Sequence, residues 1–216
     1  MGAILVHVGA SQAVAREVSG AARGGGFVQV DELEHPEAFE RIRERVAPYN
    51  AFTSADSVRE AAGERGRERV SVPDLAFGDA PQGGENGASL LVPYGDPPSV
   101  RYEYDAGVGA YRRLHGGRPT IDEAVGLEVL PENVVVISTE VTEIAGTSDV
   151  AGAPSLTYRG TGSGPVIVLR DGKRHEGTWS RGGSGTYRFA DASGTAITLK
   201  PGLTWIHILP ASVEVQ

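Results

Sequence analysis

The sequence contains no cysteine, one methionine, two tryptophans and no long hydrophobic run. Without cysteine, the chain cannot form a disulfide, a thiolate metal site, a cysteine nucleophile or a lipid-bearing cysteine. No apolar run reaches the roughly 18 residues needed to span a bilayer. The stretch "MGAILVHVGAS" has no basic segment, and its apolar core is too short for a signal peptide. We therefore predict no transmembrane segment and no targeting signal in this chain.

Basic residues are also scarce. The chain has 20 Lys and Arg against 28 Asp and Glu, a net charge of −8, and the acidic excess lies before residue 155. Because nucleic acid binding needs a dense cationic surface, we do not expect a DNA or RNA partner. The five histidines show neither H-x-H nor H-E-x-x-H spacing, and the turn "VGAS" lacks both G-x-G-x-x-G and a Walker lysine. We predict no metal site and no cofactor.

The first 95 residues alternate between strand-like and helix-like patterns, which predicts an incomplete α/β layer. The runs "ILVHV" and "FVQV" are the expected strands, and Ser11 would cap a helix between them. Pro36 would open a second helix that extends to Val46 with apolar residues on one face. Ser54 would cap a third helix that ends at Ala62, before a glycine.

Residues 96–216 show the two-residue period of antiparallel strands. The Gly- and Pro-rich stretch 78–98 is the predicted boundary between the two portions. Asp171-Gly172 supplies the positive φ angles of a type I′ turn between "PVIVLR" and "KRHEGTWSR". A second hairpin follows, and the alternation from Tyr187 to Trp205 predicts one shared buried face. The predicted class is α+β, with an α/β portion at 1–95 and an antiparallel β-rich portion with C-terminal hairpins at 96–216.

The histidines of the second portion do not predict a catalytic centre. His175 and Glu176 occupy neighbouring strand positions, so their side chains should point to opposite faces and not work as a pair. His207 alternates with Ile206 and Ile208 and is expected to be a packed strand residue. The sequence therefore assigns no catalytic residue here.

Two stretches of the first portion contain candidate site residues. His7 ends a predicted strand, where sites of α/β units gather, and with Ser11 it would resemble an acyl-transfer pair. The alternative is a buried histidine beside a helix-capping serine, since no G-x-S-x-G pattern surrounds it. The loop "APYNAFTS" concentrates polar groups ahead of a helix, and Tyr49 and Asn50 are its candidate ligand-binding residues. The alternative there is a capped turn in which Asn50 bonds the backbone.

Four segments together carry a family resemblance: "ILVHVGAS", "APYNAFTS", "VRYEYDAGVGAYRRLHGGRPTIDEAVGLEVLPENVVVI", and "GPVIVLRDGKRHEGTWSRGG" with "TLKPGLTWIHILP". They resemble the YerB-like lipoprotein family of bacteria, domain of unknown function 3048. The family's lipid-anchored leader and Gly-Pro-Val-Arg-Ser-x-Arg-like motif have no match here, so we expect this chain to correspond to the middle and carboxy-terminal portion. The family's Pro-His-Asn motif stands here as Pro48-Tyr49-Asn50. Tyrosine, with a reference pKa of about 10, would replace an acid–base histidine poorly.

The resemblance implies an extracytoplasmic protein of the cell envelope. We expect a non-catalytic module that binds a wall component or a protein partner through Tyr49 and Asn50, with His7 and Arg113 as neighbours. A second hypothesis is an envelope hydrolase or transferase that uses His7 with Ser11 or a nearby carboxylate. A third is a structural fragment whose exposed sheet edge pairs with a missing segment.

Overall fold

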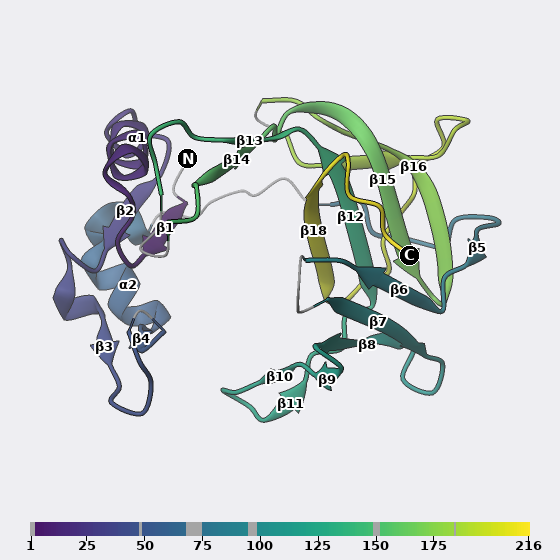
Figure 1. The fold of residues 1–216 in the computed structure, drawn as a ribbon, viewed down its shortest axis with the longest axis horizontal. Coiled ribbons are helices and arrows are strands. Elements are labelled where there is room, and N and C mark those ends of the chain that lie inside the picture. Colours follow the sequence, from purple (N-terminus) through teal and green to yellow (C-terminus); the bar gives the residue numbers. More distant parts are fainter. Residues whose placement is uncertain (1–2, 48, 68–74, 95–98, 149–151, 184) are drawn as a thin grey trace. The chain divides into compact units, whose positions relative to one another are not determined.

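The computed structural model describes residues 3–47, 49–67, 75–94, 99–148, 152–183 and 185–216. The chain divides into two compact units (Figure 1). The first comprises Met1–Val72 and Glu143–Ser155, and the second comprises Pro73–Thr142 and Leu156–Gln216. This division differs from the boundary at residues 95 and 96 expected from the sequence. The described part of the Gly- and Pro-rich stretch, residues 78–94, lies within the second unit and includes the strand Ser89–Val92, in which Leu90 and Val92 are buried.

The first unit combines short strands with both α-helices of the described residues. Its elements are β1 (Ile4–His7), α1 (Gln12–Arg23), β2 (Val28–Asp31), the 3₁₀ turn η1 (Pro36–Ala38), β3 (Glu40–Arg41), β4 (Ala51–Phe52), α2 (Ala55–Ala61) and the 3₁₀ segment η2 (Gly63–Arg67). β1 and β2 pair in parallel, as a βαβ crossover requires, and β3 and β4 form an antiparallel pair. A small core of Val30, Ala38 and Val58 joins β2, η1 and α2.

Both α-helices form where the sequence predicts them, but only α2 has the predicted capping hydrogen bond at its amino terminus. Ser54 caps α2, and its Oγ accepts the Ser57 backbone N–H at 3.1 Å. Gly63, with φ of +63°, follows the end of this helix, where glycine adopts the left-handed region without strain. Ser11 stands at the N-cap of α1, but its side chain makes no capping bond. The Ser11 Oγ is buried and has no hydrogen-bond partner among the described residues.

The predicted helix from Pro36 to Val46 is wrong. Only the single turn η1 forms, and the chain then enters β3. Val46 is 78% exposed, so the supposed apolar face does not reach a core. A short helix without a buried face is marginal in water. The backbone instead pairs across the β3–β4 turn, where the Ile42 N–H donates to the Asn50 carbonyl at 2.9 Å.

The second unit is almost entirely β-structure. Its strands are β5 (Glu85–Asn86), β6 (Ser89–Val92), β7 (Val100–Asp105), β8 (Ala110–His115), β9 (Arg118–Pro119), β10 (Ile121–Asp122), β11 (Leu127–Glu128), β12 (Asn133–Thr139), β15 (Gly162–Arg170), β16 (Lys173–Arg181), β17 (Arg188–Ala190) and β18 (Thr204–Pro210). A further pair, β13 (Val141–Glu143) and β14 (Leu156–Tyr158), lies where the chain passes between the units.

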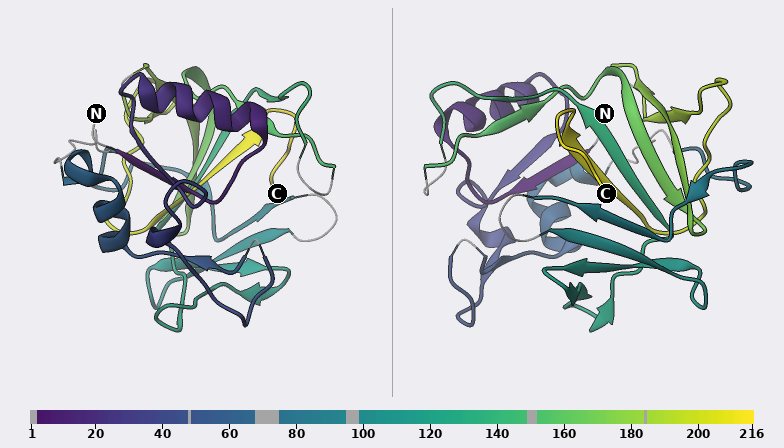
Figure 2. Two further views of the ribbon diagram at one scale, coloured as in Figure 1. Left: turned by 90° about the vertical axis from the view of Figure 1, so that its left-hand side faces the viewer. Right: turned by 45° about the vertical axis from the view of Figure 1, so that its right-hand side comes forward.

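The two larger sheets of this unit contain most of its strands, and the strands of one cross those of the other (Figures 1 and 2). The larger sheet has the order β17-β16-β15-β12-β18, with β5 beside β16, and the smaller has the order β6-β7-β8-β9. One hydrophobic cluster lies between them and includes Tyr102 and Tyr111 from the smaller sheet and Val134 and Leu169 from the larger. A second cluster, around Trp179, covers the opposite face of the larger sheet. Because both faces are covered, β12 is buried along nearly its whole length.

The β15–β16 hairpin forms as predicted. Arg170 pairs with Lys173 across the turn, and Asp171 and Gly172 have φ angles of 51° and 71°. The prediction of one buried face from Tyr187 to Trp205 is wrong at its end. β18 pairs in parallel with β12 at the opposite edge of the sheet, so Trp205 packs against the other cluster.

Candidate functional site

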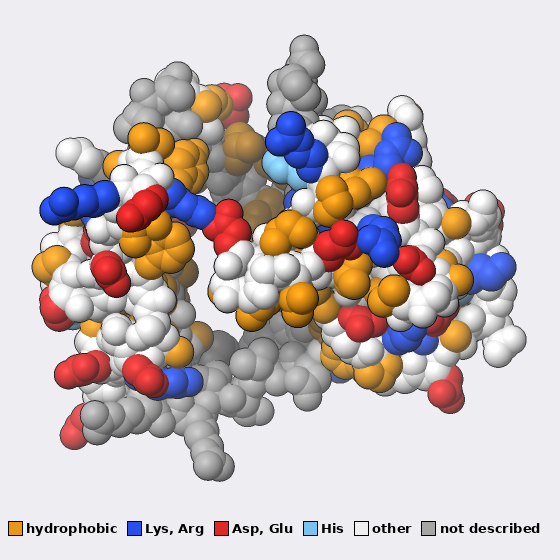
Figure 3. Space-filling view, turned by 90° about the horizontal axis from the view of Figure 1, so that it is seen from below, with side chains coloured by type: hydrophobic (Ala, Val, Ile, Leu, Met, Phe, Trp, Pro, Cys, Tyr) orange, Lys and Arg blue, Asp and Glu red, His pale blue; other side chains and the backbone are white. Residues whose placement is uncertain are grey.

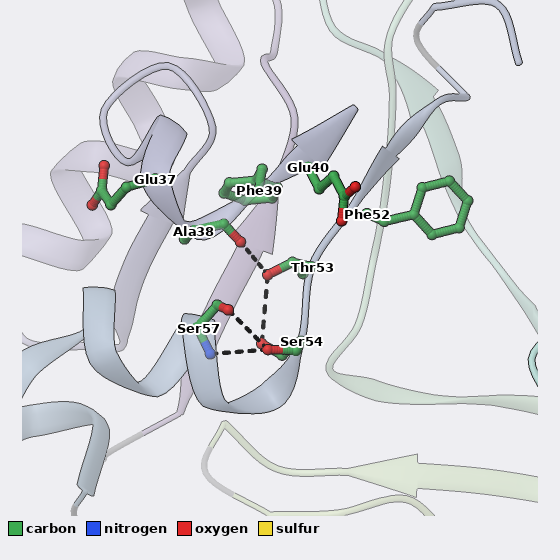
Figure 4. Close-up of a pocket in the computed structure, with 8 residues that line it drawn as sticks. All are labelled: Glu37, Ala38, Phe39, Glu40, Phe52, Thr53, Ser54 and Ser57. Carbon is green, nitrogen blue, oxygen red and sulfur yellow. Dashed lines mark hydrogen bonds between the residues drawn. The ribbon is translucent and has the colours of Figure 1, made fainter. Parts of the chain in front are cut away.

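The first unit has a pocket of about 430 Å³ between η1 and the start of α2 (Figure 4). Its lining residues are Glu37, Ala38, Phe39, Glu40, Phe52, Thr53, Ser54 and Ser57. The last residues of the loop "APYNAFTS" thus form one wall, and the segment after Pro36 forms the other. The size falls within the range of small-molecule sites.

Three hydroxyl groups define the polar wall of this pocket. In Figure 4 the Ser54 and Ser57 hydroxyls point toward each other, and the Thr53 hydroxyl points toward the Ala38 carbonyl. The Thr53 Oγ1 donates to the Ala38 carbonyl at 2.6 Å, and the Ser54 and Ser57 hydroxyls lie 2.8 Å apart. One of these two serine hydroxyls must donate to the other, which leaves one hydrogen for a ligand. The helix cap therefore fixes a wall that can both donate and accept hydrogen bonds.

Carboxylates and aromatic rings complete the lining. Glu40 and Phe52 are cross-strand partners on β3 and β4, and the Phe52 side chain is 43% exposed. A hydrogen bond from its own backbone N–H lowers the pKa of Glu37, and the His35 ring at 3.2 Å lowers it further. The pocket is therefore acidic and hydroxyl-rich and lies beside an exposed ring. Hydroxyl-bearing ligands such as sugars offer matching donors, acceptors and apolar C–H faces.

Asn50 lies in the turn between β3 and β4, and both ends of its side-chain amide are engaged. Its Oδ1 accepts from Arg41 at 2.7 Å, and its Nδ2 donates to the Ile42 carbonyl at 3.2 Å. This geometry favours the capped-turn alternative for Asn50. Tyr49 is 75% exposed and accessible to a partner. Pro48, the first residue of the motif, lies outside the described residues.

His7 is held by neighbours on both sides of its ring. Nδ1 lies 3.2 Å from the Gly9 carbonyl, and Nε2 lies 3.1 Å from the Gln29 side-chain nitrogen. Because the carbonyl can only accept, Nδ1 carries the hydrogen and Nε2 accepts from Gln29. The nearest carboxylate, Asp31, lies 3.8 Å from Nδ1. No hydrogen bond among the described residues joins His7 to Ser11, so a nucleophile and its base are not brought together here.

Arg113 lies on β8 in the second unit, whereas Tyr49, Asn50 and His7 belong to the first. Its guanidinium stacks 4.2 Å from the Trp205 ring centroid, and it donates to the Thr120 hydroxyl at 2.6 Å. Its Nε is buried without a hydrogen-bond partner among the described residues. Arg113 thus belongs to a different environment from Tyr49, Asn50 and His7.

Beside Arg113 lies a histidine–tyrosine cluster that sequence analysis did not identify. His207 is 3% exposed; its Nδ1 bonds the Tyr94 hydroxyl, and its Nε2 lies 2.8 Å from the Tyr102 hydroxyl. Burial, helped by the positive charge of Arg113, lowers the pKa of His207 to about 4. Burial raises the pKa of Tyr94 and of Tyr102. The expectation that His207 is a packed strand residue is therefore confirmed, and the cluster is uncharged at neutral pH.

Charges are mixed on the surface shown in Figure 3. Within each unit, the described Lys and Arg side chains of this face lie among Asp, Glu and hydrophobic side chains. Among the described residues, no cluster of three or more His, Asp or Glu has a geometry that could hold a metal ion. No helix in this part of the chain is long and apolar enough to cross a membrane.

Residues 90–206 match the family described as "Protein of unknown function (DUF3048) C-terminal domain". The chain belongs to this family. It is 27% identical over 169 residues to "Putative lipoprotein YerB" of Bacillus subtilis (strain 168), a match that covers 76% of this chain and 48% of the relative. The chain thus spans about half the length of this curated relative.

The crystal structure of YerB from Bacillus subtilis superimposes on this chain with a TM-score of 0.80. The match covers 100% of this chain and 71% of the YerB chain, at 22% sequence identity. The resemblance to the YerB-like family is therefore confirmed, together with a mostly β fold of antiparallel sheets.

Proposed function

We propose that this protein is a non-catalytic, extracytoplasmic envelope protein that binds a hydroxyl-rich component of the cell wall through the pocket between η1 and α2. The observation that carries this proposal is a pocket in which the Thr53, Ser54 and Ser57 hydroxyls form one wall, and which Glu37, Glu40 and the half-exposed Phe52 also line. The proposed location in the cell envelope is supported by the name of the relative, "Putative lipoprotein YerB". Lipid chains hold such proteins at a membrane surface.

The lining of the pocket supports binding over catalysis. It contains hydroxyls and carboxylates but no histidine among the eight described residues that form it. The two serine hydroxyls bond to each other, and no base within the lining activates them. His7, the candidate base of the hydrolase or transferase alternative, has its Nε2 occupied by Gln29.

Tyr49 extends the proposed binding surface along the same loop. It lies three residues before Phe52, and its exposed ring is suited to stacking on a sugar or contacting a protein partner. Asn50 contributes by holding the β3–β4 turn through Arg41 and Ile42, so its role in binding is to position the loop.

Co-sedimentation with purified cell-wall sacculi tests this proposal. We expect the protein to pellet with sacculi without releasing soluble fragments. Phe52→Ala and Glu40→Gln should weaken pelleting, by about tenfold if each removes one good contact. Glu44→Gln is the matched control, because it removes one charge from an exposed residue of the same unit that does not line the pocket.

Two results would contradict the proposal. Release of soluble wall fragments that is lost in His7→Ala would identify an enzyme. Equal pelleting of Glu40→Gln, Phe52→Ala and the control would move binding away from this pocket.

A further inference from the structure

A pocket of about 470 Å³ lies in the second unit, at one end of the larger sheet. β12 and β18 pair in parallel, so their carboxyl ends lie at the same edge of this sheet, and residues at both ends line the pocket. The start of β15 and Arg159 complete the lining. In open α/β sheets, ligands bind outside the carboxyl ends of parallel strands. The pocket has the corresponding position in this sheet, and its size suits a small molecule.

Hydroxyl groups in this lining are available to a ligand. Ser138, Ser163 and Ser212 line the pocket, and none of their three hydroxyls has a hydrogen-bond partner among the described residues. Each hydroxyl can donate one hydrogen bond and accept others. The Thr139 hydroxyl is engaged instead, because it donates to the Arg159 carbonyl at 2.9 Å. That bond holds the backbone of Arg159 at the pocket.

The Arg159 guanidinium is held beside the pocket by the main chain. It donates from Nη1 to the Thr161 carbonyl at 3.3 Å and from Nη2 to the Ser163 carbonyl at 3.2 Å. Its one ion pair among the described residues is with Glu140, where Nε and Oε2 are 3.9 Å apart and the side chains are 46% and 67% exposed. An exposed pair at this distance neutralises little of the charge. Arg159 thus offers a fixed positive charge at the pocket.

Arg181, at the end of β16, is held in the same way. Its Nε donates to the Gly185 carbonyl at 2.9 Å, and its Nη1 donates to the carbonyl of Gly160, the residue after Arg159, at 3.0 Å. Its guanidinium carbon lies 5.3 Å from the Tyr187 ring centroid. In the part of the chain that the structure describes, Arg181 forms no ion pair and its Nη2 makes no hydrogen bond. Its charge is therefore fixed without a carboxylate to neutralise it.

The two arginines lie around one pair of aromatic rings. The Arg159 guanidinium carbon lies 5.8 Å from the Trp179 ring centroid, and the Trp179 and Tyr187 rings are 5.6 Å apart in an edge-to-face arrangement. Gly162 is the cross-strand partner of Arg181, and a Cβ at this position would lie 2.4 Å from the Arg159 Nη1. The two guanidinium groups therefore lie near each other, where β15 begins and β16 ends. Like charges fixed close together favour the binding of an anion beside them.

We propose that this end of the larger sheet binds the phosphate monoester of a polyol. A phosphate monoester carries a charge of nearly −2 and three acceptor oxygens, which match the two guanidinium groups of Arg159 and Arg181. The polyol would extend into the pocket, where the free hydroxyls of Ser138, Ser163 and Ser212 match its hydroxyl groups. This site is independent of the proposed wall-binding pocket, because it lies in the other unit and shares no residue with it.

Isothermal titration calorimetry of the whole chain with glycerol 3-phosphate tests the inference, with glycerate as the carboxylate control. We expect glycerate to bind about tenfold more weakly than glycerol 3-phosphate, because a carboxylate carries less charge and fewer acceptor oxygens. Arg159→Gln and Arg181→Gln should each weaken the binding of glycerol 3-phosphate by about tenfold, the cost of one charged hydrogen bond. Arg101→Gln removes an exposed arginine of β7 and is the matched control, which should bind as the natural protein does.

Glu140→Gln tests the sign of the effect at an exposed side chain. It removes the carboxylate that pairs with Arg159, so glycerol 3-phosphate should bind about threefold more tightly. Tryptophan fluorescence of each variant checks that the fold is retained, because Trp179 lies in this unit and is fully buried.

Four outcomes would overturn the inference. The first is an equal affinity for glycerate and glycerol 3-phosphate, which would mean attraction to any small anion. The second is an equal loss of affinity in Arg101→Gln, Arg159→Gln and Arg181→Gln, which would mean that binding follows net charge alone. The third is weaker or unchanged binding to Glu140→Gln. The fourth is an equal affinity for inorganic phosphate, which would show that the polyol makes no contact with the pocket.

Discussion

Acidification should destabilise the second unit through His207. The pKa of this ring falls from 6.5 to about 4 on folding, because the neutral ring is buried between Tyr94 and Tyr102 and near Arg113. Above pH 6.5 the His207 ring is neutral in the folded and in the unfolded protein, so its protonation does not reduce the stability of the fold. As the pH falls below that value, the unfolded chain binds a proton that the folded chain excludes, so the free energy of unfolding decreases.

The magnitude follows from the size of the shift. Each pH unit between the two pKa values removes about 1.4 kcal/mol, so the full window from 6.5 to about 4 is worth about 3 kcal/mol. Between about pH 7 and about pH 5, the expected loss is about 2 kcal/mol. At 3% exposure, His207 is little screened by solvent.

Urea unfolding followed by tryptophan fluorescence measures this loss in the appropriate unit, since Trp179 and Trp205 both belong to the second unit. His207→Phe removes the titrating group and should flatten the pH dependence by about 2 kcal/mol over that range, whatever its stability at neutral pH. His115→Gln, at an exposed position of the same unit, should leave the slope unchanged. If His207→Phe and the natural protein lost stability equally on acidification, the assignment of a buried neutral His207 would be refuted.

Two further predictions concern the backbone. Ser54→Ala should destabilise α2 by about 1 kcal/mol, because the Ser54 side chain caps this helix. Ser11→Ala should change the stability of α1 little, because the Ser11 side chain makes no capping bond. Hydrogen exchange of the two helices measures both effects, and equal effects would contradict the assignment of the cap. Gly177→Ala should disrupt the β16–β17 pairing, because a Cβ at this position would lie 2.1 Å from a carbonyl oxygen of β17. Gly182→Ala is the control, because a Cβ there would meet no atom within 4 Å. Equal thermal stability of the two variants would contradict this prediction.

Local chemistry made part of the fold predictable. The Asp171-Gly172 turn and the Ser54 cap each depend on residues adjacent in the chain, and both form. The apolar run "ILVHV" predicted a strand, and β1 forms there from Ile4 to His7. The helix predicted after Pro36 does not form. Periodicity alone does not show whether an apolar face will be buried, and the Val46 side chain is exposed.

Long-range pairing could not be predicted in the same way. Nothing near Trp205 in the sequence indicates that β18 crosses to the far edge of the sheet and lies parallel to β12. The His207 cluster depends on that crossing, since Tyr94 and His207 are 113 residues apart. Only one wall of the candidate pocket could be predicted. The polar residues of the loop before Ser54 mark that wall, whereas Glu37 belongs to a segment for which the sequence predicts a helix.

The central claim is that wall components bind at the hydroxyl-lined pocket of the first unit. Chemical-shift mapping of the isotope-labelled chain with solubilised wall fragments tests it most directly. Binding should perturb the backbone amides of Thr53, Ser54 and Ser57 and those of Glu40 and Phe52, with the amide of Glu44 unchanged. Saturable shifts that instead lie outside these residues, or no shifts with fragments that compete for sacculi, would contradict the account.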